Sequence, residues 1–398
     1  MKIILVNKYW YIRGGAERVV FLTKQLLEQA GHIVEIFGMR HPQNILENDY
    51  FVDYIDYDHV RGFGKVKAGL KAIYNFDAKE KFARLVDDFK PDVVHFHNIY
   101  HQLSFSLLDV VKEKHIPAVM TMHDYNMFGP NYRLFHHGKV QDECMDGNMY
   151  HCVLDNCMEH ILQSIIATIA GYIGKQRNSQ SYIRTYISPS EFVKQKAIAY
   201  GFAREHIRAI PTPLDVHEYP ICKKDGDVVV FLGRLSEEKG LDVFIDAAKS
   251  NPDIPHTIIG DGPLYNYLEK RIEKEHIDNV TMCGHLEGKA LVSAMNNARI
   301  VVVPSLWYEV AGLSILETHA MGKIVIGSNI GAIPESLDSR FLCKPGDAQD
   351  LANKIKQWYL TPYLERQNTG KQSREMVVKK HDTHLYINSI LKVYEEVV

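Results

Sequence analysis

Residues 300–320, IVVVPSLWYEVAGLSILETHA, contain the pattern that decides the fold. A β-branched run passes through a Pro-Ser loop into an amphipathic stretch, which is typical of a parallel strand followed by a crossover helix. The loop and the predicted helix contain two carboxylates, Glu309 and Glu317, eight residues apart. We expect Glu309 in the loop and Glu317 about two turns inside a helix that begins near Gly312.

The same alternation of strand and helix recurs along the whole chain. It predicts an α/β protein made of two Rossmann-like, doubly wound domains. The expected strands are 2–7, 33–37, 92–96, 117–122 and 184–188 in the first domain, and 228–233, 257–260, 280–283, 300–304 and 323–327 in the second.

A proline-rich segment, 211–220, separates the two sets of strands and has the composition of a linker. We therefore expect a first domain at 1–218, a second at 219–380, and an amphipathic closing helix within 381–398. Open parallel sheets bind ligands beyond the carboxyl ends of their strands. Two such domains facing each other predict a ligand site in a central cleft.

The charge balance excludes some classes of partner. The 398 residues include 46 basic and 49 acidic side chains, a formal net charge of -3, so overall charge gives no argument for a nucleic-acid partner. No window reaches the roughly 20 uninterrupted apolar residues that a spanning helix requires. The first residues read as a strand rather than a signal peptide, and we expect a cytoplasmic protein.

Cysteine usage leaves two interpretations open. Six cysteines without an export signal favour reduced thiols over a disulfide framework. Three of them, Cys144, Cys152 and Cys157, lie in an irregular stretch with His137 and His151, which could complete a structural zinc site. The alternative is free or redox-labile thiols in a loop.

Three segments suit the binding of phosphate. Gly14 and Gly15 follow the first strand, where backbone N–H groups can approach an anion at a helix N-terminus. Arg234 and Lys239 lie on a strand-to-helix loop and can neutralise a departing diphosphate without a divalent metal. The N–H groups of Gly312, Leu313 and Ser314 at a helix start suit a further phosphate contact.

Polar side chains also follow two strands of the first domain. His123 comes directly after the strand at 117–122, and histidine is the side chain most easily tuned near neutral pH. His97 and Asn98 end the preceding strand, where we expect them to contact an acceptor. Their strand-end position favours a functional interpretation for all three residues.

Taken in order, these motifs resemble family 4 of the retaining glycosyltransferases, whose two-Rossmann-domain fold is called GT-B. The resemblance covers nearly the whole chain. It rests on Gly14-Gly15, His123-Asp124, the run from Gly233 to Gly240, Gly260-Asp-Gly262-Pro263, the Glu309 to Glu317 pair, and Gly331-Ala-Ile-Pro-Glu335.

The resemblance implies a role for each matching position. Arg234 and Lys239 would bind the donor diphosphate, Glu317 the ribose, and Glu309 hydroxyls of the donor sugar. His123 would contact the sugar near its anomeric carbon, so His123 and Glu309 are the expected catalytic residues. The nucleotide base would lie near His285 and Leu286, Gly14 and Gly15 would line the phosphate or acceptor side, and the closing helix would cross back onto the first domain.

The expected activity is metal-independent transfer of a hexose, with retention and without a cofactor, from a UDP- or GDP-sugar. The acceptor would be a saccharide or lipid-linked saccharide in cell-surface polysaccharide synthesis. Two alternatives remain open: a nucleotide-sugar epimerase of the same fold, and a non-catalytic nucleotide-sugar-binding protein.

Residues 65–86 predict a basic amphipathic helix. Val66, Leu70 and Ile73 share one face, and the rest is crowded by Lys65, Lys67, Lys71, Lys79, Lys81 and Arg84. Such a helix suits peripheral attachment to an anionic membrane, here the inner face of the cell membrane, or packing on its own sheet with a solvated cationic face.

Overall fold

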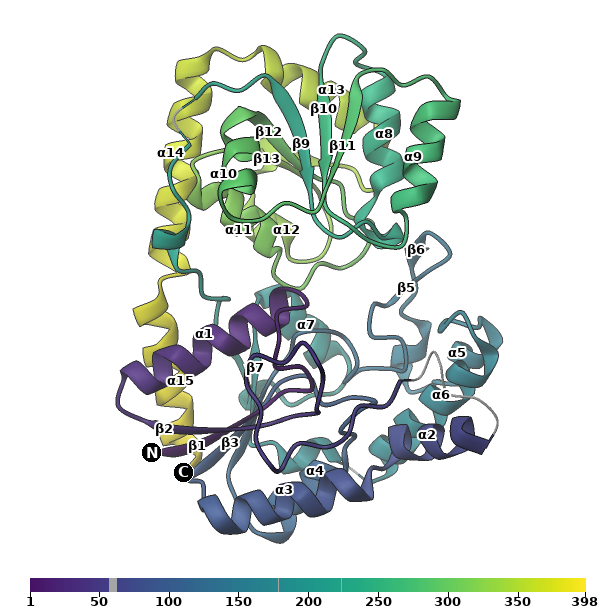
Figure 1. Ribbon diagram of the computed structural model, residues 1–398, viewed down its shortest axis with the longest axis vertical. Helices are drawn as coiled ribbons and strands as arrows, with labels where there is room; N and C mark the ends of the chain where they lie inside the picture. Colours follow the sequence, from purple (N-terminus) through teal and green to yellow (C-terminus); the bar gives the residue numbers. More distant parts are fainter. Residues whose placement is uncertain (57–62, 178, 223) are drawn as a thin grey trace. The chain divides into compact units, whose positions relative to one another are not determined.

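The computed structural model describes residues 1–56, 63–177, 179–222 and 224–398 (Figure 1). The chain divides into two compact units by its internal contacts. Unit 1 comprises Met1–Leu134, Gln141–Pro213 and Thr383–Val398, and unit 2 comprises Phe135–Val140 and Leu214–Asp382. Each unit is therefore assembled from segments that are separated in the sequence.

Unit 1 is built on a parallel six-stranded sheet in the order β2-β1-β3-β4-β7-β8. Its strands are β1 (Lys2–Val6), β2 (Ile33–Phe37), β3 (Val93–Phe96), β4 (Ala118–Thr121), β7 (Thr185–Ser188) and β8 (Ile207–Ala209). Its α-helices are α1 (Gly15–Gln29), α2 (Phe63–Ile73), α3 (Phe76–Phe89), α4 (Ser106–Glu113), α5 (His151–Leu154), α6 (Ile161–Gln176), α7 (Glu191–Ala199) and α15 (Thr383–Val397).

Unit 2 repeats this plan with a parallel sheet in the order β11-β10-β9-β12-β13-β14. Its strands are β9 (Val228–Leu232), β10 (His256–Ile259), β11 (Val280–Gly284), β12 (Ala298–Val303), β13 (Ile324–Ser328) and β14 (Leu342–Cys343). Its α-helices are α8 (Leu241–Lys249), α9 (Tyr265–Lys274), α10 (Gly288–Asn297), α11 (Leu313–Ala320), α12 (Ile333–Ser336), α13 (Ala348–Leu360) and α14 (Tyr363–Lys380).

The expected α/β fold of two parallel-sheet domains is confirmed, and the ten expected strands all occur within one or two residues of their predicted ends. Sequence reasoning missed the short edge strands β8 and β14 and the hairpin of β5 (Phe135–His136) and β6 (Lys139–Val140). Strands of two or three residues bury too little to leave an apolar period in the sequence.

The central strands are apolar because both faces of each sheet are covered. Ile3, Leu5, Val93 and Val119 are fully buried in unit 1, and β12 contributes fully buried residues to the core of unit 2. Parallel sheets with helices on both faces produce such nearly continuous apolar runs. The ends of these strands therefore provide the first places where polar side chains can reach a ligand.

Helix α15 completes the core of unit 1 although it follows unit 2 in the sequence. It lies beside α1 (Figure 1) and buries Tyr386, Ile390 and Tyr394. The hydroxyl of Tyr386 lies 2.8 Å from Oγ1 of Thr23, and that of Tyr394 lies 2.7 Å from Nδ1 of His95. The amphipathic face expected in 381–398 is thus buried against the first sheet domain.

The prediction of a single basic helix over residues 65–86 is wrong. The structure has two helices, α2 and α3, because the side chain of Asn75 accepts a hydrogen bond from the N–H of Ala78 and caps a new helix. Helix α3 is amphipathic and packs on α4. The side chains of Lys65 and Val66 lie outside the described part of the structure.

The cysteine cluster also differs from expectation. Cys152 and Cys157 form a disulfide, and Cys144 is buried beside them. Two of the three proposed zinc ligands are therefore bonded to each other, and no group of metal-ligating side chains occurs among the described residues. The disulfide contradicts zinc ligation and free thiols for this pair, and redox lability stays a prediction.

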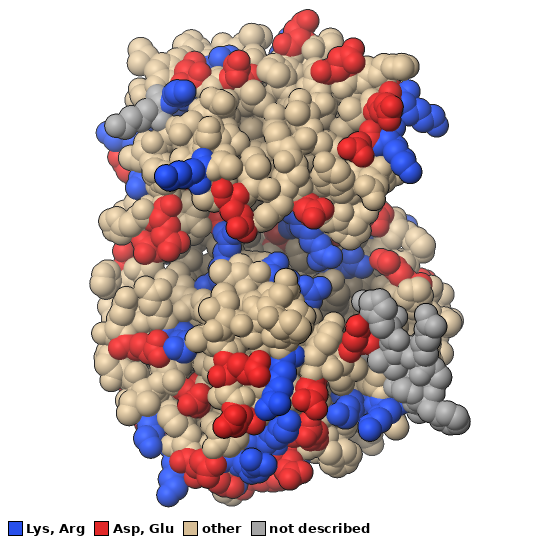
Figure 2. Space-filling view, viewed as in Figure 1, with Lys and Arg blue, Asp and Glu red and all other residues tan. Residues whose placement is uncertain are grey.

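The surface of each unit carries both signs of charge. Figure 2 shows acidic groups next to basic ones over much of the face in view, in keeping with the formal net charge of -3. Of the helices in the described part of the chain, none combines the length and apolar character needed to cross a membrane.

We predict that Ile390→Ala destabilises unit 1 by about 2–5 kcal/mol, because it leaves a cavity in a fully buried contact of α15. Urea unfolding followed by circular dichroism measures this change. The exposed neighbour Lys392→Ala is the control, with an expected change within about 0.5 kcal/mol. Equal stability of the two variants would show that α15 contributes little to the core.

Candidate active site

Two loops at the carboxyl edge of the unit 2 sheet are joined through their backbones. The N–H of Leu306, after β12, donates to the carbonyl of Glu238, after β9, at 2.8 Å. Gly240 has φ +71°, and a Cβ there would overlap the carbonyl oxygen of Pro304. Only glycine permits this approach, which brings Lys239 next to the segment that contains Glu309.

Glu309 is the centre of the polar cluster in unit 2. Its Oε1 accepts hydrogen bonds from Nζ of Lys239 at 2.6 Å and from Oγ of Ser305 at 2.7 Å. The residue is only 7% exposed. Burial alone would raise the pKa of this carboxyl group, but the adjacent Lys239 charge and these hydrogen bonds outweigh burial and lower it. Glu309 is therefore ionised at neutral pH.

Further groups at this sheet edge are able to bind a ligand. Lys239 lies over the Trp307 ring at 5.1 Å, and Arg234 is exposed with no ion pair among the described residues. Glu317 is half-buried and accepts a hydrogen bond from the Tyr219 hydroxyl at 3.1 Å. It is the fifth residue of α11, so it lies little more than one turn into the helix, not two.

The start of α11 also offers backbone donors. Gly312 is the N-cap with φ +64°, and the N–H of Ile315 bonds back to its carbonyl oxygen at 2.9 Å. The N–H groups of Leu313 and Ser314, in the first turn, are available to an anion as at any helix N-terminus. Leu286 lies just after β11 and packs on the core of unit 2, whereas His285 is exposed and pairs with Glu287.

In unit 1, parallel pairing of β3 and β4 brings three histidines together. Nδ1 of His97 lies 2.8 Å from Nε2 of His123, and the His95 and His97 rings stack at 4.2 Å. His95 in turn bonds Tyr394 and Thr121 through its two nitrogens. Burial lowers the pKa of His123 to about 4, so its imidazole is neutral at neutral pH.

The direction of the bond between His97 and His123 depends on the remaining nitrogen of His97. Nε2 of His97 is buried and has no partner among the described residues. A buried N–H without an acceptor is costlier and rarer than an unused lone pair. We therefore assign the proton to Nδ1 of His97, which donates to Nε2 of His123 and leaves a hydrogen on Nδ1 of His123.

His97 is not placed to contact an acceptor. It is 1% exposed, so the expectation of acceptor binding is corrected to one of positioning His123. Asn98 is 7% exposed, and its backbone N–H donates to the side chain of Asn7. Asn98 thus joins the loops that follow β1 and β3.

Sequence reasoning did not identify Lys8 and Asp124 as residues whose charges interact. Burial is the largest influence on both: it lowers the pKa of Lys8 and raises the pKa of Asp124, and the attraction between their charges opposes both shifts. Their positions in the sequence could have indicated this interaction, because Lys8 follows β1 just as Asp124 follows β4. A cation at a strand end is as informative about a site as a histidine there.

The N-terminus of α1 has a carboxyl group beside it. Glu17 is 5% exposed, and burial raises the pKa of its carboxyl group although backbone N–H groups of Glu17 and Gly14 oppose this. Oε2 of Glu17 would lie 3.8 Å from a Cβ built at Gly14, so this carboxyl group is close to the loop at which we expected phosphate. Binding of phosphate or acceptor by Gly14 and Gly15 stays a prediction.

The structure thus brings together Lys239, Glu309, Ser305 and Trp307 in unit 2, and His95, His97 and His123 in unit 1. Arg234 and the start of α11 belong to the same edge of the unit 2 sheet, since they follow β9 and β12. Each group lies at the carboxyl ends of parallel strands, which is the general position of ligand sites in open α/β sheets.

Comparisons with known proteins identify the family of the chain. Residues 13–218 match the model of glycosyltransferase family 4, and residues 220–376 match that of glycosyl transferases group 1. An uncharacterized 42.6 kDa protein in the cps region of Klebsiella pneumoniae is 24% identical over 84% of this chain and 87% of its own length. The alpha-D-kanosaminyltransferase of Streptomyces kanamyceticus is 24% identical over 44% of this chain and 46% of its own.

Solved structures share the fold over the whole chain. A glycosyltransferase from Rickettsia africae has a TM-score of 0.71 at 16% identity and covers 100% of this chain and 98% of its own. Sucrose-phosphate synthase from Thermosynechococcus elongatus has a TM-score of 0.72 at 18% identity and covers 99% and 98%. HepE from Anabaena, in complex with UDP, has a TM-score of 0.68 at 17% identity and covers 100% of both chains.

One family model spans more than half of the chain, and these neighbours share the arrangement of two parallel-sheet units. The chain belongs to glycosyltransferase family 4 and has the GT-B fold.

Proposed function

We propose that this chain is a retaining, metal-independent hexosyltransferase that uses a UDP- or GDP-sugar as donor. Its acceptor is a saccharide or lipid-linked saccharide, and its role is in cell-surface polysaccharide synthesis. The observation that carries the proposal is the buried ion pair of Lys239 and Glu309 at the strand ends of unit 2. Support for the donor comes from Anabaena HepE, which was solved with UDP-glucose, and support for the role from the Klebsiella relative in a cps region.

The donor diphosphate is assigned to the cations and helix start of unit 2. Arg234 and Lys239 supply positive charge, and the N–H groups of Leu313 and Ser314 supply donors that need no reorganisation. Glu317, half-buried at the same sheet edge, is assigned to the ribose hydroxyls, and Leu286 to the base. These groups stabilise the charge that grows on the diphosphate as it leaves.

Glu309 is assigned to the donor sugar. The hydrogen bonds from Lys239 and Ser305 both fall on Oε1, and Oε2 is assigned to accept from sugar hydroxyls. Lys239 contributes to binding of both the sugar and the diphosphate, because its ammonium group holds Glu309 in place and lies on the loop assigned to the diphosphate. Loss of either partner leaves the other as a desolvated, unpaired charge.

His123 is assigned to the same sugar from unit 1. As a neutral imidazole with a hydrogen on Nδ1, it donates to a sugar hydroxyl without adding charge near the anomeric carbon. In the reaction the bond from the anomeric carbon to the diphosphate breaks, and the acceptor hydroxyl attacks from the same face. Its proton passes to the departing phosphate oxygen, so no external base is required.

We also propose that unit 1 attaches to an anionic membrane surface. Helix α6 exposes Ile161, Ile165, Ile169 and Tyr172 at spacings that place them on one helical face. Helix α2 packs against α6 and exposes Leu70, with Lys67 and Lys71 on the same helix. A large exposed apolar patch beside cations suits a membrane interface.

The buried ion pair is tested by removing either partner. Glu309→Gln and Lys239→Ala should each lower transfer by at least about 100-fold, because each removes charge stabilisation specific to the transition state. Transfer is measured with the donor chosen from a thermal-shift panel of UDP-, GDP- and ADP-sugars.

A matched control is the exposed pair of Lys249 and Glu275 in the same unit, also at 2.6 Å. Lys249→Ala and Glu275→Gln should leave transfer within about twofold, as expected for exposed ion pairs. Full activity in Glu309→Gln or Lys239→Ala would remove the site assignment. Interconversion of the donor sugar would instead indicate an epimerase, and binding without turnover a non-catalytic protein.

Stereochemistry and metal dependence are tested together. In excess EDTA, an α-linked donor should give a product whose first-formed anomer is α by proton NMR, because Arg234 and Lys239 replace a divalent cation. An initially β product would contradict retention. Loss of activity in EDTA that returns only with added Mg²⁺ or Mn²⁺ would contradict metal independence.

Membrane attachment is tested by vesicle sedimentation. The wild-type protein should sediment with vesicles of phosphatidylglycerol and phosphatidylcholine, and Ile169→Glu should reduce the bound fraction because it introduces a charge into the exposed face of α6. Ile33→Glu is the control, since Ile33 is similarly exposed on the edge strand β2. A wild-type protein that stays in the supernatant would exclude this attachment.

A further inference from the structure

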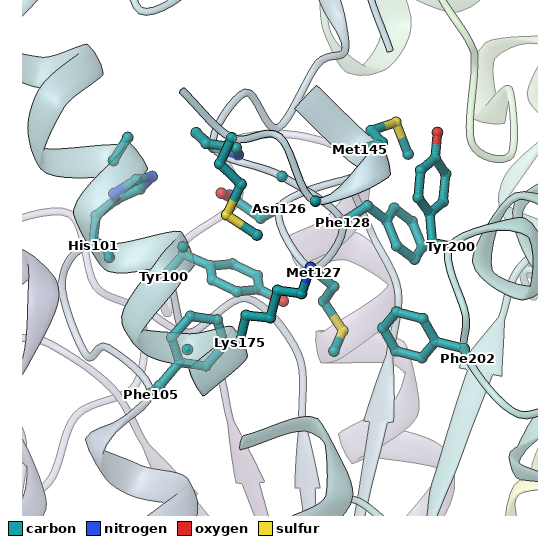
Figure 3. A pocket seen from close by; sticks show the side chains of 18 of the residues that line it. Tyr100, His101, Phe105, Asn126, Met127, Phe128, Met145, Lys175, Tyr200 and Phe202 are labelled. Carbon is teal, nitrogen blue, oxygen red and sulfur yellow. The ribbon is translucent and has the colours of Figure 1, made fainter. Parts of the chain in front are cut away.

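Unit 1 encloses a cavity that the motifs of the sequence do not account for. It has a volume of about 450 Å³, within the usual range of small-molecule sites. Its wall is formed by the segments after β3 and β4, by α6, and by the residues that follow α7 (Figure 3). Two of these segments begin just beyond His97 and His123.

The wall of the cavity is mainly aromatic and thioether-lined. Figure 3 shows Phe105, Met127, Phe128 and Phe202 around one space. Its described lining contains no Asp or Glu, and Lys175 is the one Lys or Arg in it. His101 also lines the space, but burial lowers its pKa to about 4, so it is neutral at neutral pH. This surface suits an apolar ligand that bears one negative group.

Tyr100 provides a second indication of a ligand. It is 6% exposed, lines the cavity, and its hydroxyl has no hydrogen-bond partner among the described residues. In Figure 3 the hydroxyl points toward the middle of the space. Tyr386 and Tyr394, which are similarly buried in this unit, both have hydrogen-bond partners. A buried hydroxyl left unpaired costs folding free energy, so it marks a place where a ligand oxygen completes the site.

Helix α6 relates the cavity to the exterior of unit 1. Ala167, Ala170, Gly171 and Gly174 line the cavity on one face of the helix, while the exposed apolar residues Ile161, Ile165, Ile169 and Tyr172 lie on the opposite face. A Cβ at Gly171 would lie 2.5 Å from Sδ of Met149, so a larger residue there would require that side chain to move. One face of α6 thus exposes apolar side chains, and its opposite face lines the apolar cavity.

We infer that this cavity binds the apolar chain of a lipid-linked acceptor, next to the phosphate that joins the chain to its saccharide. The inference rests on the proposed transferase function and assigns its acceptor class. Lys175 pairs with the phosphate, the Tyr100 hydroxyl donates to one of its oxygens, and the aromatic and methionine side chains hold the first part of the chain. The saccharide would then extend from the cavity along the segments that begin at His97 and His123.

Direct binding tests the inference without donor or turnover. Farnesyl phosphate, farnesol and inorganic phosphate are titrated into the full-length protein by calorimetry below the micelle concentration. Farnesyl phosphate should bind at least about tenfold more tightly than farnesol, and inorganic phosphate should not bind measurably. Equal affinity for farnesyl phosphate and farnesol would overturn the role of Lys175, and no binding of either would overturn the inference.

Three variants locate the site. Ala170→Trp fills the cavity and should weaken farnesyl phosphate binding by at least about tenfold, whereas Ala30→Trp, exposed after α1, should not. Lys175→Gln should weaken farnesyl phosphate binding but leave farnesol binding unchanged. Its control is Gln176→Glu, which alters the net charge by the same amount on the next residue of α6.

Tyr100→Phe tests the site even if Ala170→Trp fails to fold. It should weaken farnesyl phosphate binding while the Tm stays equal or rises, because the hydroxyl has no partner to lose. A lower Tm with unchanged affinity would assign Tyr100 to structure alone and overturn its role. Donor-induced shifts in Tm are recorded in parallel: their presence without farnesyl phosphate binding overturns only the acceptor class, and their absence in the wild type overturns the proposed function.

Discussion

A buried carboxylate must be paired with a cation or with hydrogen-bond donors. In unit 2 this requirement determines how the loops at the carboxyl edge of the sheet are arranged. Glu309 is buried and bonded to Lys239 and Ser305, so the loop after β9 and the loop after β12 must meet. Their backbones reinforce the meeting through Leu306 and Glu238, and Gly240 is the residue that lets them approach. Gly331 serves the next loop, since a Cβ there would overlap the backbone of Glu309.

The histidines of unit 1 are stabilised in a different way. They are held by one another and by Tyr394 and Thr121, without a counter-charge, and burial keeps His123 neutral. The edge of unit 2 is therefore rich in charge, while the edge of unit 1 presents a neutral donor.

The sequence predicted the parts of this structure that depend on period and order. The apolar runs before Gly233, Pro304 and His123 are long enough to identify strands, and the polar residues just beyond those strands include Lys239, Glu309 and His123 itself. It could not reveal that His97 is buried, because burial depends on stacking against His95 and on α15. It missed the cavity beside Tyr100, because that cavity is lined by segments that meet only in three dimensions. The break at Asn75 and the disulfide of Cys152 and Cys157 are local features that the periodicity of apolar residues does not reveal.

The placement of α15 affects how the chain reaches its native state. The sheet of unit 1 is complete in sequence by Ala209, yet its core includes Tyr386, Ile390 and Tyr394, which come after all of unit 2. During synthesis from the N-terminus, unit 2 can therefore acquire a closed core while unit 1 still exposes the surface that α15 will cover. The histidine at the base of the unit 1 site, His95, gains its tyrosine partner only at that last step. Completion of the histidine cluster is thus coupled to translation of all of unit 2.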